Sequence, residues 1–435
     1  MRIPTTPPAL GNLVRHMQPD VLLEALTAGQ RVPDYPSWDK LRRRPVPQGL
    51  TSEQWWAGVK LVRNLKPVPL WDRAGKSFFL GTPTRVNQLL YDVSISTAGR
   101  IGTAERVLGD AQRDRYLLSS LREEAISSSL LEGAATTRRE AKEMLRTQRP
   151  PRTRGERMVA NNFAAMQWIR EHVRQNITPE AILELHAIVT AGTLDDPEDE
   201  GRMQLPGERR VIVGSEDDVV LHDPPPAEGL PERMAALCRF ANGETGDGWL
   251  HPLARAILTH FMMGYDHYFV DGNGRTTRAL FYWVALREGH WLIEFLSISR
   301  LLTKAPTQYA RAYLNTEIDD GDLTYFLLHQ LEVISQALDE LQAYLDDKQR
   351  EVREASSWAR DLGLNHRQVA LVQRAIEDPA VVFTARSHAA SHGVTVQTAR
   401  SDLVSLEGLG VLEPTRRGRR VEWSASPAGL ANLKV

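Results

Sequence analysis

Residues 267–278 place several chemically useful side chains in one short stretch, His-Tyr-Phe-Val-Asp-Gly-Asn-Gly-Arg-Thr-Thr-Arg. His267 offers an imidazole, which can take a proton from an incoming hydroxyl group. Asp271 offers a carboxylate, which can hold a Mg²⁺ ion that bridges phosphate oxygens. Phosphoryl-type transfer depends mainly on positioning and charge neutralisation, and this inventory supplies both. The stretch therefore predicts a site that grips and attacks a nucleoside triphosphate.

The glycines and arginines of the same stretch suit a phosphate-binding turn. Gly272 and Gly274 allow positive φ angles and keep side chains away from a ligand. Their amides would point into the N-terminus of the following helix, which is a natural anion site. Arg275 and Arg278 are three residues apart, so both can lie on one helix face and reach successive phosphates.

Two helices must position this turn. Residues 252–266 are apolar enough for a buried helix, with His267 at its end. Residues 275–286 are again helical in character, without Gly or Pro until Gly289. We therefore expect a helix, a tight turn and a second helix.

The stretch resembles the Fic motif, which defines a family whose members mostly transfer AMP from ATP to protein hydroxyls. Eight positions carry the resemblance: His267, Phe269, Asp271, Gly272, Asn273, Gly274, Arg275 and Arg278. So many fixed positions make a chance match improbable. The resemblance implies that His267 is the base, that Asp271 is the Mg²⁺ ligand and that ATP is the co-substrate. It also implies that Asn273 and the glycine amides surround the α-phosphate, while Arg275 and Arg278 take the β- and γ-phosphates.

Two positions depart from the family pattern. Proline is usual where Tyr268 stands, and an apolar residue is usual where Asp266 stands. Neither change removes a reacting group, but a carboxylate beside the base could alter the pKa of His267 or hold its ring in place. The resemblance makes Phe269 a core anchor rather than a catalyst.

A second segment, residues 126–133, resembles the inhibitory motif of the same family, Ser/Thr-x-x-x-Glu-Gly/Asn. Ser128 and Glu132 are one helical turn apart and share a face, and Gly133 suits a C-terminal cap. The resemblance implies that Glu132 pairs with Arg278 and so blocks the position where the γ-phosphate would bind. It also opens the prospect that the same glutamate supports removal of AMP from a target. The alternative is that Glu132 is an ordinary solvated residue at a helix end.

Two short β-branched runs within residues 201–226 predict a hairpin. The first run contains Val211, Ile212 and Val213, and the second precedes a proline run. In the family such a flap holds the target as an added strand, so the resemblance implies that these residues present a hydroxyl to His267. The alternative is a surface hairpin that merely covers the core.

The composition is that of a soluble intracellular enzyme. A length of 435 residues suggests roughly two to four domains, and an apolar content of 42% is ample for their cores. A formal net charge of −2 gives no general attraction to nucleic acids or acidic membranes. Cys238 is the only cysteine, which excludes an intrachain disulfide and favours a small buried residue. Because no apolar run resembles a membrane span or a signal peptide, we expect a cytoplasmic protein.

We expect a mainly α fold in three parts. Residues 1–103 would form an N-terminal arm that packs on the core, with one clear helix beginning near Ser52. Residues 104–357 would form the Fic helical domain, which includes the inhibitory helix and the hairpin flap. Residues 358–435 would form a separate C-terminal domain of the winged-helix (α+β) type.

Two further features lie late in the Fic part. Tyr309 and Tyr313 are four residues apart on a predicted helix, so either could wall an adenine pocket, although core packing is the favoured role. A long helix over residues 322–355 carries a leucine-rich stripe. The stripe indicates packing within the fold, with a homodimer seam as the alternative.

The C-terminal part resembles a winged helix of the repressor type, with three helices and an arginine-rich hairpin. The resemblance implies that Thr398 and Arg400 face DNA and that the wing, with Arg417, contacts the DNA backbone. Residues 361–435 carry nine Lys and Arg against seven Asp and Glu, a surplus too small to promise tight DNA binding. A protein-docking or dimerising module is the alternative that we slightly favour.

Three functions therefore compete. The first is a Mg²⁺- and ATP-dependent protein adenylyltransferase that modifies a Ser, Thr or Tyr hydroxyl of a target protein, or of itself, and is restrained by Glu132. The second transfers another moiety, such as UMP or phosphate, although the intact Gly-Asn-Gly turn and both arginines favour a triphosphate in the AMP orientation. The third is a DNA-binding regulator whose Fic part senses a nucleotide.

Overall fold

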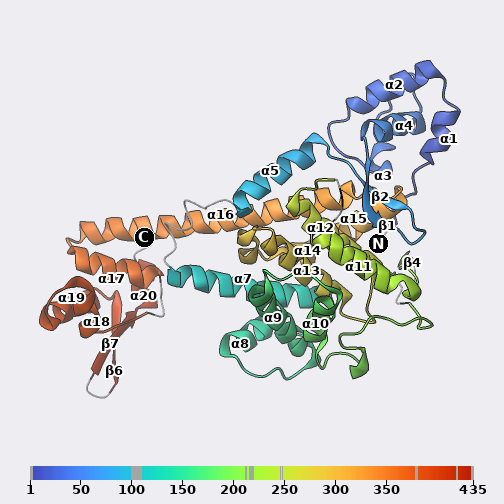
Figure 1. The fold of residues 1–435 in the computed structure, drawn as a ribbon. Helices are drawn as coiled ribbons and strands as arrows, with labels where there is room; N and C mark the ends of the chain where they lie inside the picture. The colour runs from blue at the N-terminus through green and yellow to red at the C-terminus, as the bar shows by residue number, and fades with distance from the viewer. Residues whose placement is uncertain are drawn as a thin grey trace. The chain divides into compact units, whose positions relative to one another are not determined.

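The computed structural model of the chain describes residues 3–98, 110–210, 213–214, 220–244, 246, 248–377, 381–417 and 420–432. Helices supply most of these residues, and the strands form three small antiparallel sheets (Figure 1). The mainly α fold class expected from the sequence is confirmed.

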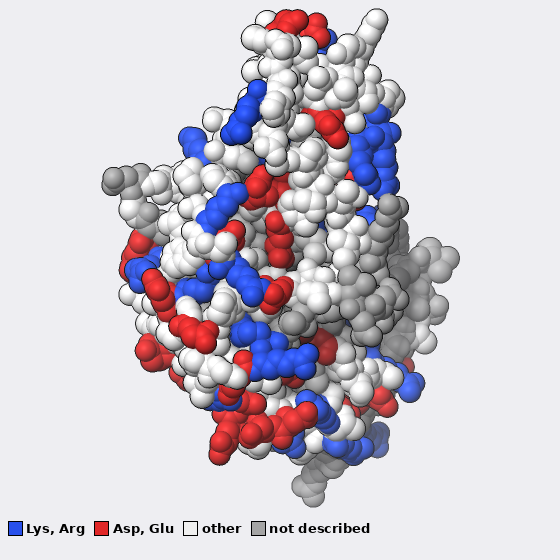
Figure 2. All heavy atoms as spheres, turned by 90° about the vertical axis from the view of Figure 1, so that its right-hand side faces the viewer, with Lys and Arg blue, Asp and Glu red and all other residues white. Residues whose placement is uncertain are grey.

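The chain divides into two compact units, which are described separately. One unit contains residues 1–100 and 117–338, and the other contains residues 101–116 and 339–435. None of the helices in the described ranges combines the length and the apolar character that a membrane crossing requires. Basic and acidic side chains are intermixed over the face drawn in Figure 2, in keeping with the small net charge.

The first hundred residues contain more secondary structure than the single helix expected. Their elements are α1 (Leu10–Arg15), α2 (Pro19–Gln30), α3 (Trp38–Leu41), α4 (Ser52–Val62), β1 (Lys66–Trp71), β2 (Ser77–Leu80) and α5 (Thr84–Ala98). The expected helix is α4, which begins at Ser52 because Thr51 and Gln54 form a reciprocal capping box. Trp38, Trp55 and Trp56 are buried together in one cluster, which explains the tryptophan content of this region.

A buried ionic cluster joins this region to the segment before the long helix of the first unit. Lys60 of α4 and Arg63, which caps its C-terminus, face Asp319 and Asp322 across distances of 2.9 to 3.8 Å. All four side chains are almost fully buried. Tyr35 adds a hydrogen bond of 2.7 Å to Asp322. Two cations balance two anions, so the cluster carries no net charge into the interior.

The main helical body follows. Its helices are α7 (Asp110–Leu131), α8 (Arg138–Thr147), α9 (Arg154–His172), α10 (Pro179–Thr190), α11 (Leu230–Ala241), α12 (Pro252–Asp266), α13 (Asn273–Arg287), α14 (Ile298–Lys304), α15 (Pro306–Ile318) and α16 (Thr324–Asp361). Short 3₁₀ segments cover Pro197–Asp199, Ala227–Gly229 and Trp291–Phe295. α13 packs against α9, α10 and α12 (Figure 1). Ile257, Phe261, Leu280 and Trp283 are completely buried, so α12 and α13 form a rigid core pair.

The predicted hairpin is present as β3 (Val213–Gly214) and β4 (Val220–His222), which are antiparallel. Val213 pairs with His222, and Gly214 pairs with Val220. Val211 and Ile212, which we expected at the target-binding edge, lie outside the described residues. Cys238 is buried in α11, and burial raises the pKa of its thiol to about 12.

The C-terminal unit ends in an α+β arrangement. Its elements are α17 (His366–Glu377), β5 (Val382–Phe383), α18 (Ala385–His392), α19 (Val396–Gly408), β6 (Leu412–Arg417), β7 (Arg420–Ala425) and α20 (Pro427–Asn432). The three expected helices and the hairpin occur in the expected order, whereas β5 and α20 were not predicted. The sheet order is β5-β7-β6, and Leu371, Leu403, Leu406 and Trp423 belong to the apolar core beneath it.

We predict that Asp322→Asn will lower the free energy of unfolding of the first unit by about 3–5 kcal/mol, because Lys60 and Arg63 then share the single buried carboxylate of Asp319 and one positive charge is uncompensated. The matched control is Asp320→Asn, two residues earlier, where the ion pair with Lys76 is more than half exposed. Chemical unfolding should separate the two variants clearly. Equal losses of stability in both would contradict the role assigned to the cluster.

Candidate active site

The loop between α12 and α13 holds most of the residues that the sequence singled out. His267 caps the end of α12 and adopts a left-handed backbone with φ of 51° and ψ of 57°, which is unusual for a residue with a side chain. Gly272 precedes α13 with φ of 81°, a conformation that glycine adopts without strain. The expected arrangement of helix, tight turn and helix is therefore present.

The side chain of Asn273 closes this loop on itself. Its Oδ1 accepts a hydrogen bond of 2.9 Å from the backbone N–H of Phe269, and its Nδ2 donates to the carbonyl of Phe269 at 2.7 Å. Asn273 is buried, so these two bonds satisfy backbone groups that water does not reach. The side-chain amide of Asn273 therefore organises the loop, while the backbone N–H of Gly272 donates to Oδ1 of Asp271.

The loop is also supported by a histidine of α10 that the sequence did not predict. His186 of α10 stacks on Phe269, with ring centroids 3.7 Å apart, and its Nδ1 accepts from the N–H of Gly201. Its Nε2 therefore carries the proton and donates to the carbonyl of Asp271 at 2.9 Å. Burial lowers the pKa of His186 to about 4, so the ring is neutral at physiological pH. The only sequence signal was a histidine on an otherwise apolar helix face.

The carbonyls at the C-terminal end of α12 accept hydrogen bonds from side chains. The capped groups belong to Gly264, Tyr265, Asp266 and His267. Nη2 of Arg210 donates to the last two at 2.7 and 2.9 Å, and Nε2 of His222 donates to Tyr265 at 2.6 Å. These cationic or polar groups suit the negative end of a helix. Neither Arg210, which precedes the flap, nor His222, the last residue of β4, was predicted as a capping residue.

His267 is held so that one ring nitrogen stays free for chemistry. Its Nδ1 faces the carbonyl of Gly264 at 3.4 Å, which leaves Nε2 as the nitrogen able to accept a proton. Burial, and after it the nearby His222, lowers the pKa of His267 to about 4. The ring is therefore neutral over the physiological pH range, as a proton acceptor must be.

The two arginines of α13 are in different electrostatic states, although both are buried. Arg275 donates from Nη1 to the carbonyl of Val189 at 3.1 Å, but its Nε and Nη2 find no hydrogen-bond acceptor in the described part of the chain. Burial accordingly lowers the pKa of Arg275. Unpaired buried donors are costly, so these N–H groups indicate a seat for an anion.

Arg278 is compensated by the segment at the end of α7. Its Nη1 lies 3.0 Å from Oε1 of Glu132, its Nε donates to Oγ of Ser128 at 2.8 Å, and its Nη2 donates to the Ser128 carbonyl at 2.9 Å. Burial alone would lower the pKa of Arg278, but Glu132, Tyr309 and Glu124 together outweigh it, and the pKa is raised. The structure thus brings Glu132 and Ser128 onto the second arginine of the motif.

Glycine at position 274 makes this approach feasible. A Cβ atom there would overlap the Glu132 carboxylate. Glu132 therefore lies against the start of α13, where the backbone N–H groups of the turn point, as well as against Arg278. Its side chain is still 29% exposed, in contrast to the buried Arg278, so the carboxylate can leave without dismantling the core.

Asp271 is the motif carboxylate that remains open to solvent. Its side chain is half exposed, and its oxygens lie 3.7 Å from Arg275 and 3.9 Å from Arg154. No group of three or more His, Cys, Asp or Glu that could hold a metal occurs among the residues that the structure describes. A single carboxylate nevertheless fits Mg²⁺, which usually takes one or two protein carboxylates and completes its shell with phosphates and water.

The two departures from the family pattern do not act on the base directly. The Asp266 carboxylate turns away from His267 and contacts Arg233 of α11 and the hydroxyl of Tyr268. Asp266 and Tyr268 are both buried. Their side chains therefore belong to the support of the loop and not to its open face.

Tyr309 and Tyr313 of α15 lie in an aromatic cluster beside α12. The hydroxyl of Tyr309 bonds Nε2 of His260 at 2.7 Å, and the ring of Tyr313 stacks on Phe261. Burial raises the pKa of Tyr309, while the neighbouring Arg278 opposes the rise. Tyr309 is thus near the arginine pair, and both tyrosines contribute to core packing.

The C-terminal candidates belong to the other unit. Arg400 of α19 is exposed between the exposed side chains of Val396 and Val404, whereas Thr398 is half-buried and its hydroxyl bonds that of Thr395 at 2.9 Å. Arg417 is the last residue of β6, and its side chain lies outside the described part. The exposed face of α19 is therefore partly apolar, with one central arginine.

Comparisons with known proteins match this geometry. Residues 176–285 match the family model described as Fic/DOC family. The proteins named protein adenylyltransferase Fic from Drosophila sechellia and Drosophila melanogaster are each 35% identical over 128 residues, which cover 29% of this chain and 24% of each relative. The chain thus spans about a quarter of the length of these curated relatives.

A solved structure supports the same fold over a larger part of the chain. The crystal structure of a Fic family protein from Desulfovibrio desulfuricans G20 aligns with a TM-score of 0.52 at 20% identity, and the alignment covers 80% of this chain and 97% of that one. The family match includes α12, the motif loop and most of α13. The chain therefore contains a Fic domain of the Fic/DOC family, and the loop between α12 and α13 carries its motif.

Proposed function

We propose that this protein is a Mg²⁺- and ATP-dependent adenylyltransferase that moves AMP onto a hydroxyl side chain of a target protein, with its own chain as a further acceptor. The observation that carries the proposal is the pair of buried arginines at the start of α13. One has unpaired N–H groups, and the other is held by an exchangeable carboxylate. Two adjacent cationic seats beside a neutral imidazole suit a triphosphate whose α-phosphate is attacked.

The reaction follows from the positions of the side chains. The target hydroxyl gives its proton to Nε2 of His267 while its oxygen forms a bond to the α-phosphorus of ATP. The bond between the α-phosphorus and the oxygen that bridges to the β-phosphate breaks, and pyrophosphate leaves with that electron pair. Arg275 and Arg278 bind the β- and γ-phosphates and stabilise the charge that develops on the leaving group.

Asp271 is the residue that would hold Mg²⁺, and the ion would neutralise charge on the phosphates. The backbone amides at Gly272, Asn273 and Gly274 would receive the α-phosphate at the N-terminus of α13. This orientation favours transfer of the nucleotide that carries the α-phosphate over transfer of the γ-phosphate from the same scaffold. Removal of AMP would use the same loop, with Glu132 positioned beside it.

Glu132 restrains the enzyme by occupying Arg278. A carboxylate and a γ-phosphate compete for the same guanidinium, so the pair must open before ATP binds with all its phosphates engaged. The flap β3–β4 would then hold an extended target segment near His267, because strand addition fixes the register of the hydroxyl. Val213 lies on this flap, and its pairing with His222 ties the flap to the end of α12.

We predict that Glu132→Gly will raise ATP affinity and AMP labelling by at least about ten-fold. The change frees the Arg278 guanidinium, whose interaction with a phosphate should contribute more than about 1.4 kcal/mol to the binding free energy. Glu132→Gln should give a smaller gain, since it removes the charge but keeps the side chain. The matched control is Glu143→Gln, which removes an acid paired with Arg146 on the exposed side of α8. Titration calorimetry with ATP and a labelling assay measure both effects; unchanged binding in Glu132→Gly would rule out the inhibitory role.

A second prediction separates AMP transfer from kinase chemistry. In the Glu132→Gly background, label should pass to protein from α-labelled ATP and not from γ-labelled ATP. Adding His267→Ala should abolish transfer while leaving ATP affinity within about two-fold, because the base acts only in the chemical step. Transfer from γ-labelled ATP alone would overturn the proposal, and mass spectrometry of the product should show the mass of AMP.

A third prediction concerns pH. Protonation of His267 on its reactive nitrogen stops the reaction, and its pKa of about 4 lies below the ordinary value of 6.5. As pH falls, activity should therefore persist through 6.5 and decline only as the lowered pKa is approached. The profile of kcat/KM for the Glu132→Gly variant, measured with excess Mg²⁺, reports the free enzyme. An acid limb centred at 6.5 or higher would contradict the buried, neutral imidazole.

A further inference from the structure

The residues on either side of His267 hydrogen-bond to each other across it. The hydroxyl of Tyr268 donates to Oδ2 of Asp266 at 2.6 Å, so a side-chain bridge spans the proposed base. Both residues are buried, with side chains that solvent does not reach. These are also the two positions at which the sequence departs from the family pattern, so the departures form one unit in the folded chain.

Such a bridge has a mechanical purpose at this point of the chain. His267 has a positive φ, which costs a residue with a side chain free energy and persists only where the surroundings impose it. A proline at 268 would stiffen the backbone covalently, because its ring fixes φ. Tyr268 has no such ring closure. The hydrogen bond from its hydroxyl to Asp266 supplies a restraint on the same short segment from the side chains instead.

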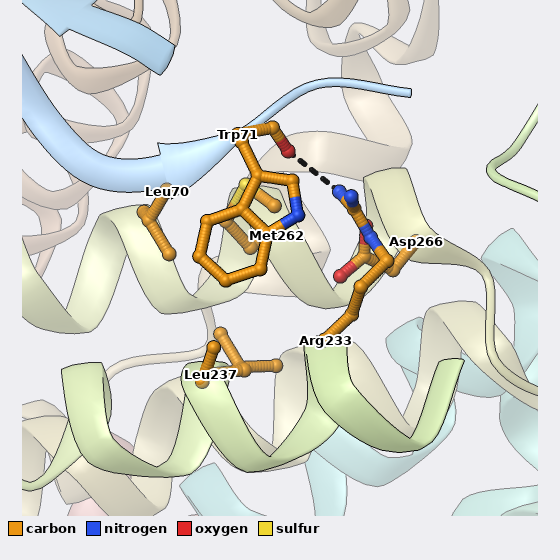
Figure 3. Close-up of a pocket in the computed structure, with 7 residues that line it drawn as sticks. Leu70, Trp71, Arg233, Leu237, Met262 and Asp266 are labelled. Atoms are coloured by element: carbon orange, nitrogen blue, oxygen red, sulfur yellow. Dashed lines mark hydrogen bonds and ion pairs between the residues drawn. The ribbon is translucent and has the colours of Figure 1, made fainter. Parts of the chain in front are cut away.

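Arg233 anchors this bridge to the rest of the unit. Its Nε donates to Oδ1 of Asp266 at 2.7 Å, and its Nη2 lies 2.6 Å from the same oxygen. Its remaining bonds go to backbone carbonyls of the β1–β2 hairpin, from Nη2 to Trp71 at 2.6 Å and from Nη1 to Asp72 at 3.1 Å. Figure 3 shows the guanidinium between the Trp71 carbonyl and the Asp266 carboxylate.

The hairpin thus completes the support of the loop. The Trp71 ring lies 5.7 Å from the Arg233 guanidinium, and apolar side chains including Leu70, Leu237 and Met262 line the cavity beside it (Figure 3). The cavity has about 10 Å³ of space, which is room for at most a single water, so the ion pair is closely packed. A second contact joins the hairpin to α12, since the backbone N–H of Arg73 donates a hydrogen bond of 3.0 Å to the Tyr265 hydroxyl.

We propose that Asp266, Tyr268 and Arg233, braced by the β1–β2 hairpin, are positioning residues that hold the His267 ring in its reactive orientation. This inference rests on the proposed function in one respect only, since it takes His267 to be the base. None of the three touches the reacting atoms. Their effect is on where the imidazole points and on how much water reaches it.

The kinetic test uses Tyr268→Phe in the Glu132→Gly background, because this change removes one hydroxyl and keeps the ring. We expect kcat for AMP transfer to fall by about ten- to a hundred-fold with an unchanged KM for ATP, as small misplacements of a reacting group do. The matched control is Tyr282→Phe, which removes another buried hydroxyl, bonded at 2.8 Å to the Leu296 carbonyl. Equal kcat values for the two variants would overturn the proposal.

A second measurement is independent of activity. Histidine-labelled NMR spectra, with the His267 signal assigned from His267→Ala, report the pKa of the ring in the wild-type chain. Burial sets it at about 4, and loosening of the loop in Tyr268→Phe should admit water and raise it toward 6.5. In Tyr282→Phe it should not move. If the Glu132→Gly variant transfers no AMP, the proposed function fails while this titration still decides the positioning role; an unshifted titration in Tyr268→Phe would sink it.

Discussion

The guanidinium of Arg278 is buried, and a buried cation must have a counter-charge. In this structure the counter-charge is the Glu132 carboxylate, and the Ser128 hydroxyl and carbonyl take further N–H groups. The neighbouring Arg275 has only the half-exposed Asp271 carboxylate at 3.7 Å, and its Nε and Nη2 lack hydrogen-bond acceptors among the described residues. The site therefore favours a bound negative charge, which either the Glu132 carboxylate or a phosphate can supply. Inhibition and substrate binding then become two solutions of one electrostatic requirement.

The difference in exposure between the two partners gives this exchange a direction. Arg278 is fixed inside the core by Ser128 and cannot move out to meet a ligand. Glu132 lies just beyond the end of α7 and is more exposed than Arg278. It contacts Arg278 through the carboxylate at the end of its side chain. Opening therefore moves the acid and keeps the arginine in place. A cation that is already in position, and whose carboxylate partner can leave, favours catalysis because the arginine need not move when the phosphate arrives.

The sequence predicted local features well and long-range ones poorly. The turn, both helices around it, and the proximity of Glu132 to Arg278 were anticipated, because the motif spacing and the helix periodicity are local signals or come from a family resemblance. His186, Arg210 and Arg233 were missed. Each acts on the loop from a segment that lies 33 to 85 residues away along the chain, so no spacing rule links them to it. The part played by residues 66–73 was likewise unreadable, since their backbone carbonyls, and not their side chains, make the decisive bonds to Arg233.

The end of α12 explains how target binding and catalysis are joined. A helix leaves its last carbonyls without partners, and here the partners come from the two arms of the flap, Arg210 before it and His222 within it. His222 also bonds Glu317 at 2.7 Å, so both of its nitrogens face acceptors. The flap that would hold the target is therefore bonded to the backbone of the residue that would take the target's proton. A shift of the flap on target binding should therefore change the position of His267, because the same capping hydrogen bonds hold both.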